Sequence, residues 1–407
     1  MNQKTLIGLA IAALVAIVAA VVLNHANKPS SEGRSDTSNW LAPSLRDHVN
    51  DVSKVVVIGA GDKTLATLVR GAKGWTLAEK GGYAIDTGKL REFLLKLGDA
   101  KLVERKTVIP EKYATLGVED VSAKEAKGLQ VELDGLAQPL KLILGMTNPR
   151  GGTFVRRVGD VQSWLASGTL SVEKNAADWL KKDLVDISAD RVASIAITHS
   201  DGKTVRITKD ARGDANFKLA DIPKGRETGS EYTINALAAT LAGLRFDDVL
   251  PAKDAAPAAD TLKAHYATFD GVIVDMVAWQ KDGKDEVQFT ASLDAEQADK
   301  GVIAAQAKAK TEFESATAAA AANKQAGATE APIKPLAISD AAKDHENRMA
   351  ALSKEVADLN ARFSGWTYVL PAYKFASINK SIDDLLKPLE DKKPAASAKS
   401  PAPKRGK

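Results

Sequence analysis

Apolar and polar residues alternate in short runs over most of the chain, which is the pattern of strands that bury one face. Typical runs are VVVIG (55–59), TLATLVR (64–70), SIAIT (194–198) and TVRIT (204–208). Two windows repeat leucine at helical spacing instead: Leu90, Leu94 and Leu97, and then Leu237, Leu241 and Leu244. Strand runs gathered around a few helices predict an α+β fold with mainly antiparallel sheets.

The same order of runs occurs twice along the chain, which indicates an internal duplication. Corresponding positions are Trp40 and Trp179, Val55 and Ile195, Trp75 and Phe217, and Leu90 and Leu237. We therefore expect two tandem copies of one sheet-plus-helix unit, residues 40–170 and residues 171–294 joined with 363–388. The second copy is expected to end in the strand-type stretch GWTYVLPAYKFASI, residues 365–378.

The stretch GAGDKT, residues 59–64, follows an apolar run and resembles the start of a dinucleotide-binding loop. Such a loop needs a third glycine near position 64, where threonine stands, and it opens a helix. Here a second strand-type run follows instead, and the duplicate carries HSDGKT (199–204) at the same place. Gly and Asp supply the positive φ of a tight turn, so both stretches are predicted to be hairpin turns.

A helical insertion, residues 295–362, is expected to interrupt the second copy. It opens with an Ala-, Lys- and Glu-rich stretch, and its second helix repeats apolar residues at spacings of three and four. The residues of this seam are Met349, Leu352, Val356, Leu359 and Phe363. A seam of two heptads is marginal alone, so it must pack on something. It either folds back on its own domain or forms a surface for a partner helix.

An apolar segment without charges, Leu6–Leu23, lies near the N-terminus. As a helix it spans about 27 Å, enough for the hydrocarbon layer of a membrane. We expect residues 1–24 to be an uncleaved transmembrane anchor and 25–39 to be a linker, with a cleaved signal peptide as the alternative. The rest of the chain is then expected in the periplasm of a bacterium, attached to inner-membrane lipid as a single-pass protein.

The last segment, residues 389–407, is expected to be a disordered basic tail, because its Pro, Ala, Ser and Lys cannot form a core. It is either a solvated end or a contact for polyanions such as lipid headgroups or cell-wall polymer. Its cations are Lys392, Lys393, Lys399, Lys404, Arg405 and Lys407. Lys and Arg total 56 against 52 acids over the whole chain, and no basic stripe precedes the tail, so nucleic acid is not an expected partner.

No arrangement of residues in the sequence points to catalysis. The chain has no cysteine, which excludes disulfides, thiolate nucleophiles and cysteine-bound zinc. His345-Glu346 begins a zinc-protease pattern, but Met349 occupies the position of the second histidine. No nucleophile elbow surrounds any serine. We therefore expect a non-enzymatic protein without catalytic, cofactor-binding or metal-binding residues.

Four segments of the first copy resemble a known bacterial family. They are Trp75-Thr76-Leu77 before a leucine-rich helix, KYATLGVED (112–120), LILG (142–145) and GGTFVRRVGDVQSWL (151–165). They are similar to domain-of-unknown-function family 4340, and the likeness covers most of residues 40–290 and 364–386. The resemblance implies a membrane-anchored periplasmic protein. Some family members accompany ABC-transporter auxiliary subunits of the gliding-motility type. Its motifs are structural, so no site residue is carried over.

These observations lead to one expectation about function and one alternative. We expect an accessory or scaffold protein of a membrane complex, with partners such as the permease or ATPase of an ABC-type exporter. The alternative is a periplasmic binding module for a cell-envelope polymer or a small ligand, which would use the basic tail. The sequence leaves the oligomeric state open.

Overall fold

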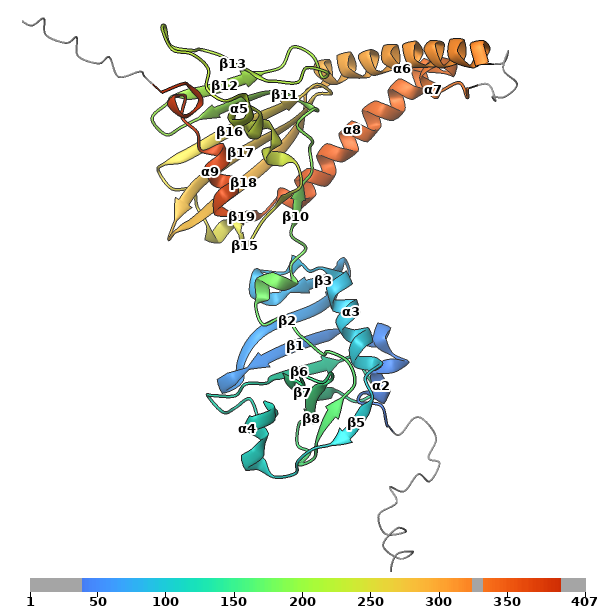
Figure 1. The fold of residues 1–407 in the computed structure, drawn as a ribbon, viewed down its shortest axis with the longest axis vertical. Coiled ribbons are helices and arrows are strands. Elements are labelled where there is room, and N and C mark those ends of the chain that lie inside the picture. Colours follow the sequence, from blue (N-terminus) through green and yellow to red (C-terminus); the bar gives the residue numbers. More distant parts are fainter. Residues whose placement is uncertain (1–38, 324–331, 389–407) are drawn as a thin grey trace, which may run out of the picture. The chain divides into compact units, whose positions relative to one another are not determined.

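The computed structural model describes residues 39–323 and 332–388, which form two compact units (Figure 1). The first unit contains residues up to 65 together with 88–172. The second contains 66–87 together with the residues from 173 on. Residues 66–87 thus pack with the later part of the chain, although they lie within the early part of the sequence.

The predicted membrane anchor, almost all of the predicted linker, and the basic tail lie outside the described residues. Within the described part of the chain, no helix combines the length and the apolar composition needed to cross a bilayer. The α+β class with antiparallel sheets, predicted from the alternating runs, is confirmed.

The first unit contains six strands of a nine-stranded antiparallel sheet, in the order β1-β6-β7-β8-β9-β5. Its alternating runs place one face inside: Val55 and Val57 are fully buried in β1, as are Val131 and Leu133 in β6. The strands are β1 (Lys54–Gly59), β5 (Leu102–Arg105), β6 (Leu129–Asp134), β7 (Leu140–Thr147), β8 (Thr153–Arg157) and β9 (Ser163–Ala166). The helices are α2 (Pro43–Arg46), α3 (Thr87–Gly98) and α4 (Tyr113–Leu116).

Helix α3 has the buried face that its sequence predicted. Leu90, Phe93, Leu94 and Leu97 recur every three or four residues, and each is at most 5% exposed. Packing this face removes apolar area from water, so the helix is stabilised mainly by its contacts with the unit's core.

The second unit is built on an antiparallel sheet with the strand order β13-β12-β11-β16-β17-β18-β19-β15. Its strands are β11 (Val192–Thr198), β12 (Thr204–Thr208), β13 (Lys218–Leu219), β15 (Asp248–Pro251), β16 (Thr261–Thr268), β17 (Val272–Lys281), β18 (Lys284–Leu293) and β19 (Trp366–Leu370). A separate pair is formed by β10 (Asp183–Val185) and β14 (Leu244–Arg245). The helices are α5 (Glu231–Ala238), α6 (Ala295–Asn323), α7 (Leu336–Ser339), α8 (Ala341–Phe363) and α9 (Ala372–Ile378).

The segment 66–87 joins this second unit through aromatic packing. It carries most of β2 (Lys63–Gly71), then β3 (Gly74–Leu77) and β4 (Tyr83–Ala84), which pair in the order β4-β3-β2. Tyr83 is only 7% exposed. Its ring meets those of Phe246, Trp366 and Tyr368 edge to face, with centroids 5.5, 4.9 and 6.1 Å away. We call these four residues the aromatic cluster.

Both predicted turns are confirmed. A short 3₁₀ turn, Ala60–Asp62, follows β1, and β2 begins directly after it. Gly61 and Asp62 both have positive φ, at 68° and 57°, which is why this position takes the two residue types that tolerate that conformation. In the second unit, His199 N donates to Lys203 O and closes the turn between β11 and β12.

One predicted strand is wrong. Residues 366–370 form β19, but the stretch after Pro371 is helix α9. Proline is favoured at a helix start, and Phe375 and Ile378 lie three residues apart, so a helix buries both of them. The apolar residues of this stretch are compatible with a strand or a helix. Pro371 marks the point where the strand ends and the helix begins.

Candidate functional site

The second unit carries a helical arm, defined as α6, α7 and α8. The arm leaves the sheet after β18 and returns to it at β19, and these two strands pair directly, with Val287 opposite Tyr368. Figure 1 shows α6 and α8 extending away from the sheet, with α7 at their outer end. The arm is therefore inserted into one connection between neighbouring strands.

Close backbone contacts fix the start of α6. A Cβ atom on Gly301 would lie 2.8 Å from the carbonyl oxygen of Phe269, so only glycine lets the helix approach the β16–β17 turn this closely. On the other side of the contact, a Cβ atom on Gly271 would lie 2.6 Å from Ala298 N. Gly271 also has a positive φ of 81°, which favours glycine. Gln297 adds a hydrogen bond from Nε2 to Phe269 O, 2.9 Å. Small residues thus determine where the arm begins.

The end of α8 is fixed on the sheet by one amide and one ring. Asn360 accepts from Ala291 N at 2.9 Å and donates to Ala291 O at 2.8 Å, so its side chain pairs with the backbone of β18 as a neighbouring strand would. Phe363 is 2% exposed, and its ring centroid lies 5.3 Å from that of Phe289. This half of α8 is part of the unit's core.

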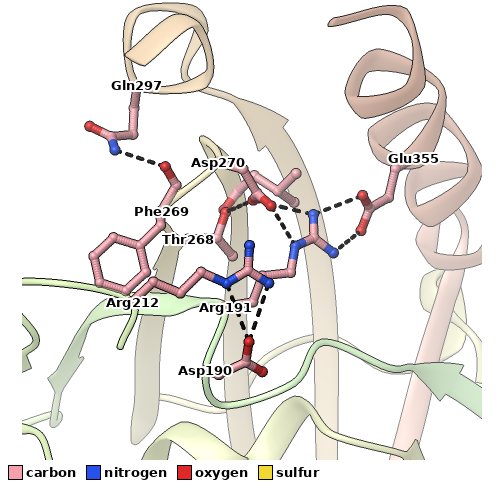
Figure 2. A network of polar contacts seen from close by, with 9 residues as sticks. Asp190, Arg191, Arg212, Thr268, Phe269, Asp270, Gln297 and Glu355 are labelled. Carbon is pink, nitrogen blue, oxygen red and sulfur yellow. Dashed lines mark hydrogen bonds and ion pairs between the residues drawn. The ribbon is translucent and has the colours of Figure 1, made fainter. Parts of the chain in front are cut away.

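Between these two attachments lies a network of ion pairs centred on Arg191, which precedes β11 (Figure 2). Its guanidinium donates to Asp270, with Nε to Oδ2 at 2.7 Å and Nη2 to Oδ1 at 3.2 Å. It also donates to Glu355 of α8, with Nη1 to Oε1 at 2.8 Å and Nη2 to Oε2 at 2.9 Å. Thr268 Oγ1 donates to Asp270 Oδ1 at 2.6 Å. One arginine therefore joins the sheet to the arm through two bidentate contacts.

The guanidinium of Arg191 stays charged in this network. Arg191, Asp270 and Glu355 have side chains 18%, 22% and 33% exposed. Partial burial alone would lower the pKa of Arg191, but the hydrogen bonds and charges of Glu355 and Asp270 outweigh it and raise that pKa. A permanently charged arginine that already makes four hydrogen bonds is suited to holding two elements at a set angle.

Farther out, polar contacts connect α6 to α8. His345 Nε2 lies 2.8 Å from Asp299 Oδ1, and Gln306 Nε2 donates to Asp344 Oδ2 at 3.0 Å. Arg348 donates from Nε to Asp344 at 2.7 Å. Hydrogen bonds from Arg348 and Gln306 hold the pKa of Asp344 below its ordinary range. Within the part of the chain that the structure describes, no group of three or more His, Asp or Glu is placed to hold a metal ion.

The predicted partner seam runs along α8, and the structure divides it. Leu359 and Phe363 are buried in their own unit, 5% and 2% exposed. Met349, Leu352 and Val356 are half-buried. Leu352 lines a cavity of about 240 Å³ between α6 and α8, together with Val302. The inner end of the seam is occupied by the sheet, so only the outer residues leave area for another helix.

The other predicted contact residues, Lys392 to Lys407, lie outside the described residues. Sequence reasoning missed the Arg191 network altogether. Its members are separated by 79 and 164 positions in the chain. The only local signal was the Asp270-Gly271 turn, which does not indicate an arginine partner.

Comparison with known proteins gives one match. Residues 75–264 match the family described as Domain of unknown function (DUF4340). The matched region begins in β3 and ends in β16. No curated protein and no solved structure matches the chain. Over residues 75–264 the chain is therefore similar to the DUF4340 family, which supports the resemblance seen in its motifs.

Proposed function

We propose that this protein is a non-enzymatic accessory or scaffold subunit of a membrane complex, with its bulk in the periplasm and its N-terminus anchored in the inner membrane. Its proposed partners are the permease or ATPase subunits of an ABC-type exporter. The anchor and the location rest on the apolar segment Leu6–Leu23. The arm supplies the surface for the partner.

We also propose that the two sheets come from a tandem duplication. The order β1-β6-β7-β8-β9-β5 in the first sheet and the order β11-β16-β17-β18-β19-β15 in the second support it, because the strands correspond one by one along the chain. Helices α3 and α5 also occupy equivalent places in the sequence of elements. The main difference is in one connection between neighbouring strands. Residues 158–162 join β8 to β9 in the first sheet, whereas the arm joins β18 to β19 in the second.

The arm is the observation that carries the proposed function. It is an addition to a unit whose counterpart does without it, and it is attached to the sheet at three places by close packing, an amide pair and the Arg191 network. Exposed apolar residues lie along it, including Ile303 at 54% and Ile333 at 94%. A firmly attached projection with exposed apolar side chains is suited to contacting a partner.

Shortening the arm tests this proposal. Gln306 Nε2 donates to Ala341 O at 2.8 Å, so a short Gly-Ser linker can replace residues 307–340 without moving the base of the arm. After mild detergent extraction, affinity capture of the unaltered chain is expected to retrieve permease or ATPase subunits, identified by mass spectrometry. The shortened chain is expected to lose them.

A matched control keeps the arm and changes an exposed residue elsewhere in the same unit, as in Tyr232→Ser, at a position that is 83% exposed. This control is expected to retain the same subunits. Recovery of the unaltered chain alone, or equal recovery of subunits with the shortened arm, would contradict the proposal.

A further inference from the structure

A second feature of this unit lies away from the arm. A groove with a volume of about 740 Å³ runs between residues 216–219 and residues 226–229. We call it the β13 groove. Volumes of roughly 300–1,000 Å³ are typical of binding pockets. The groove is open, and two runs of consecutive residues form its long walls, so it has the form of a slot.

The first wall is the edge of the sheet. Among the described strands β13 is the last in its sheet, with β12 on one side only. The wall is held in place from α5: Asn235 Oδ1 accepts from Phe217 N at 2.9 Å, and Glu231 accepts from Asn216 Nδ2 at 2.7 Å. A fixed terminal strand offers one backbone edge for a further strand. Asn235 already accepts the N–H of Phe217, so the edge that remains for such a strand is at Leu219.

The opposite wall is a short pair of extended segments. Gly229 N donates to Leu385 O at 2.8 Å, and Lys387 N donates to Glu227 O at 2.9 Å. Arg226 supports this pair with a hydrogen bond from Nη2 to Lys387 O, 3.0 Å. The slot therefore lies between two fixed stretches of main chain.

The groove is lined by both apolar and charged side chains. Phe217, Leu219 and Ile234 are at most 8% exposed, and Ile222 is 38% exposed. Three cations and two carboxylates line the groove: Lys218, Arg226, Lys387, Glu227 and Glu231.

Lys218 is the cation most readily available to a ligand. It pairs with Asp210, and both side chains are largely exposed, 66% and 68%. Exposed pairs of this kind contribute about 0–1 kcal/mol, so an incoming carboxylate can replace Asp210 at little cost. Both carboxylates of the groove already have partners: Glu227 pairs with Lys387, and Glu231 with Asn216.

We propose that the β13 groove binds an extended peptide segment of a partner protein, with an apolar side chain next to an acidic one. The peptide lies along the edge of β13, as in strand addition. Its apolar side chain packs on Ile222 and the apolar base of the groove, and its carboxylate reaches Lys218. This site goes beyond the proposed scaffold role and does not use the arm.

Three labelled peptides test the proposal by fluorescence anisotropy with the full chain in mild detergent. They are acetyl-Gly-Asp-Leu-Asp-Gly-amide, the same peptide with lysine for aspartate, and the same peptide with glycine for leucine. We expect the first to bind more tightly than the other two. Ile222→Ser is expected to weaken its binding about tenfold, equivalent to 1.4 kcal/mol. Lys218→Glu is expected to weaken it as well.

The matched control is Ile109→Ser, at an isoleucine of the first unit that is 43% exposed, and it is expected to bind as the unaltered chain does. Replacing the leucine by photo-leucine and digesting the cross-linked protein locates the peptide, with labels expected within residues 216–234 or 385–387. Equal binding of all three peptides, no binding of any at millimolar concentration, or labels confined to other residues would overturn the proposal.

Discussion

The second unit attaches two segments to its sheet in contrasting ways. Residues 66–87 are attached by the aromatic cluster, whose rings bury a large apolar area, while the arm is attached near its base by the Arg191 network. Burial of aromatic rings stabilises in proportion to the area removed from water. A partly buried ion network gains less, because desolvation of the charges offsets their attraction. The aromatic cluster should therefore determine the stability of the second unit, and the Arg191 network should determine the direction of the arm.

Removing the key ring of the aromatic cluster is expected to have the largest effect. Tyr83→Ala should lower the free energy of unfolding of the second unit by about 3–5 kcal/mol, as for other large aromatic truncations. Scanning calorimetry of the full chain measures the loss. Tyr83→Phe keeps the ring and removes only the hydroxyl, which is hydrogen-bonded with Tyr368. It should cost about 1 kcal/mol, the usual value of one hydrogen bond. Tyr232→Ala, at an 83% exposed tyrosine, is the control. A small effect of Tyr83→Ala would mean that residues 66–87 are not needed for the unit's stability.

Breaking the ion network should change the direction of the arm more than stability. Glu355→Ala leaves Arg191 with Asp270 alone and is expected to cost about 1–3 kcal/mol. The chain has no cysteine, so cysteines placed at Lys263 and Glu314 can carry spin labels uniquely. We expect the distribution of distances between these labels to broaden.

The control for that measurement is Asp358→Ala on the same helix. Its partner is Lys354, and the two side chains are 52% and 74% exposed. An unchanged distribution in Glu355→Ala would show that close packing at the ends of the arm is sufficient to orient it.

Acid should weaken the outer contacts between α6 and α8. The pKa of Asp344 is lowered in the folded chain by its hydrogen bonds with Arg348 and Gln306. A carboxyl group with a lowered folded pKa contributes stability above its unfolded pKa and loses it as the pH falls through the folded value. Protection from hydrogen exchange in residues 299–306 should therefore decrease below about pH 4. Asp344→Asn should show reduced protection already at pH 7 and less dependence on pH. Equal pH profiles for both chains would exclude this group as the cause.

The smallest effect is expected beside the network, at an exposed ion pair. Arg212 pairs with Asp190 at 3.2 Å, with side chains 55% and 58% exposed (Figure 2). Arg212→Ala should change stability by less than about 1 kcal/mol, because exposed ion pairs are screened by water and salt. Chemical denaturation in low and high salt measures it. If Arg212→Ala lowers stability as much as Glu355→Ala does, the difference in solvent exposure does not explain the strengths of the Arg212–Asp190 and Arg191–Glu355 ion pairs.

The sequence predicted those parts of the fold whose cause is local. Leu90, Leu94 and Leu97 predicted the buried face of α3, and Gly61 with Asp62 predicted the turn after β1. Apolar period and turn chemistry act over a few residues, so a single sequence displays them. The same reasoning misjudged residues 372–378, where an apolar stretch without clear alternation suits either a strand or a helix.

What escaped prediction depends on contacts distant in sequence. Nothing near Tyr83 indicates that its ring meets Trp366. Arg191, Asp270 and Glu355 are ordinary surface residue types, and only the folded sheet and arm bring them together. The seam on α8 was visible as a pattern, but the pattern could not show that Phe363 packs on Phe289.

The place of the arm in the chain has a consequence for related sequences. Strands β18 and β19 pair directly at the base of the arm. The sheet is therefore insensitive to the number of residues in the arm between these two strands. The entropic cost of a longer excursion grows only slowly with its length. Relatives can therefore gain or lose whole helical turns here, adjusting how far the protein reaches while leaving its architecture intact.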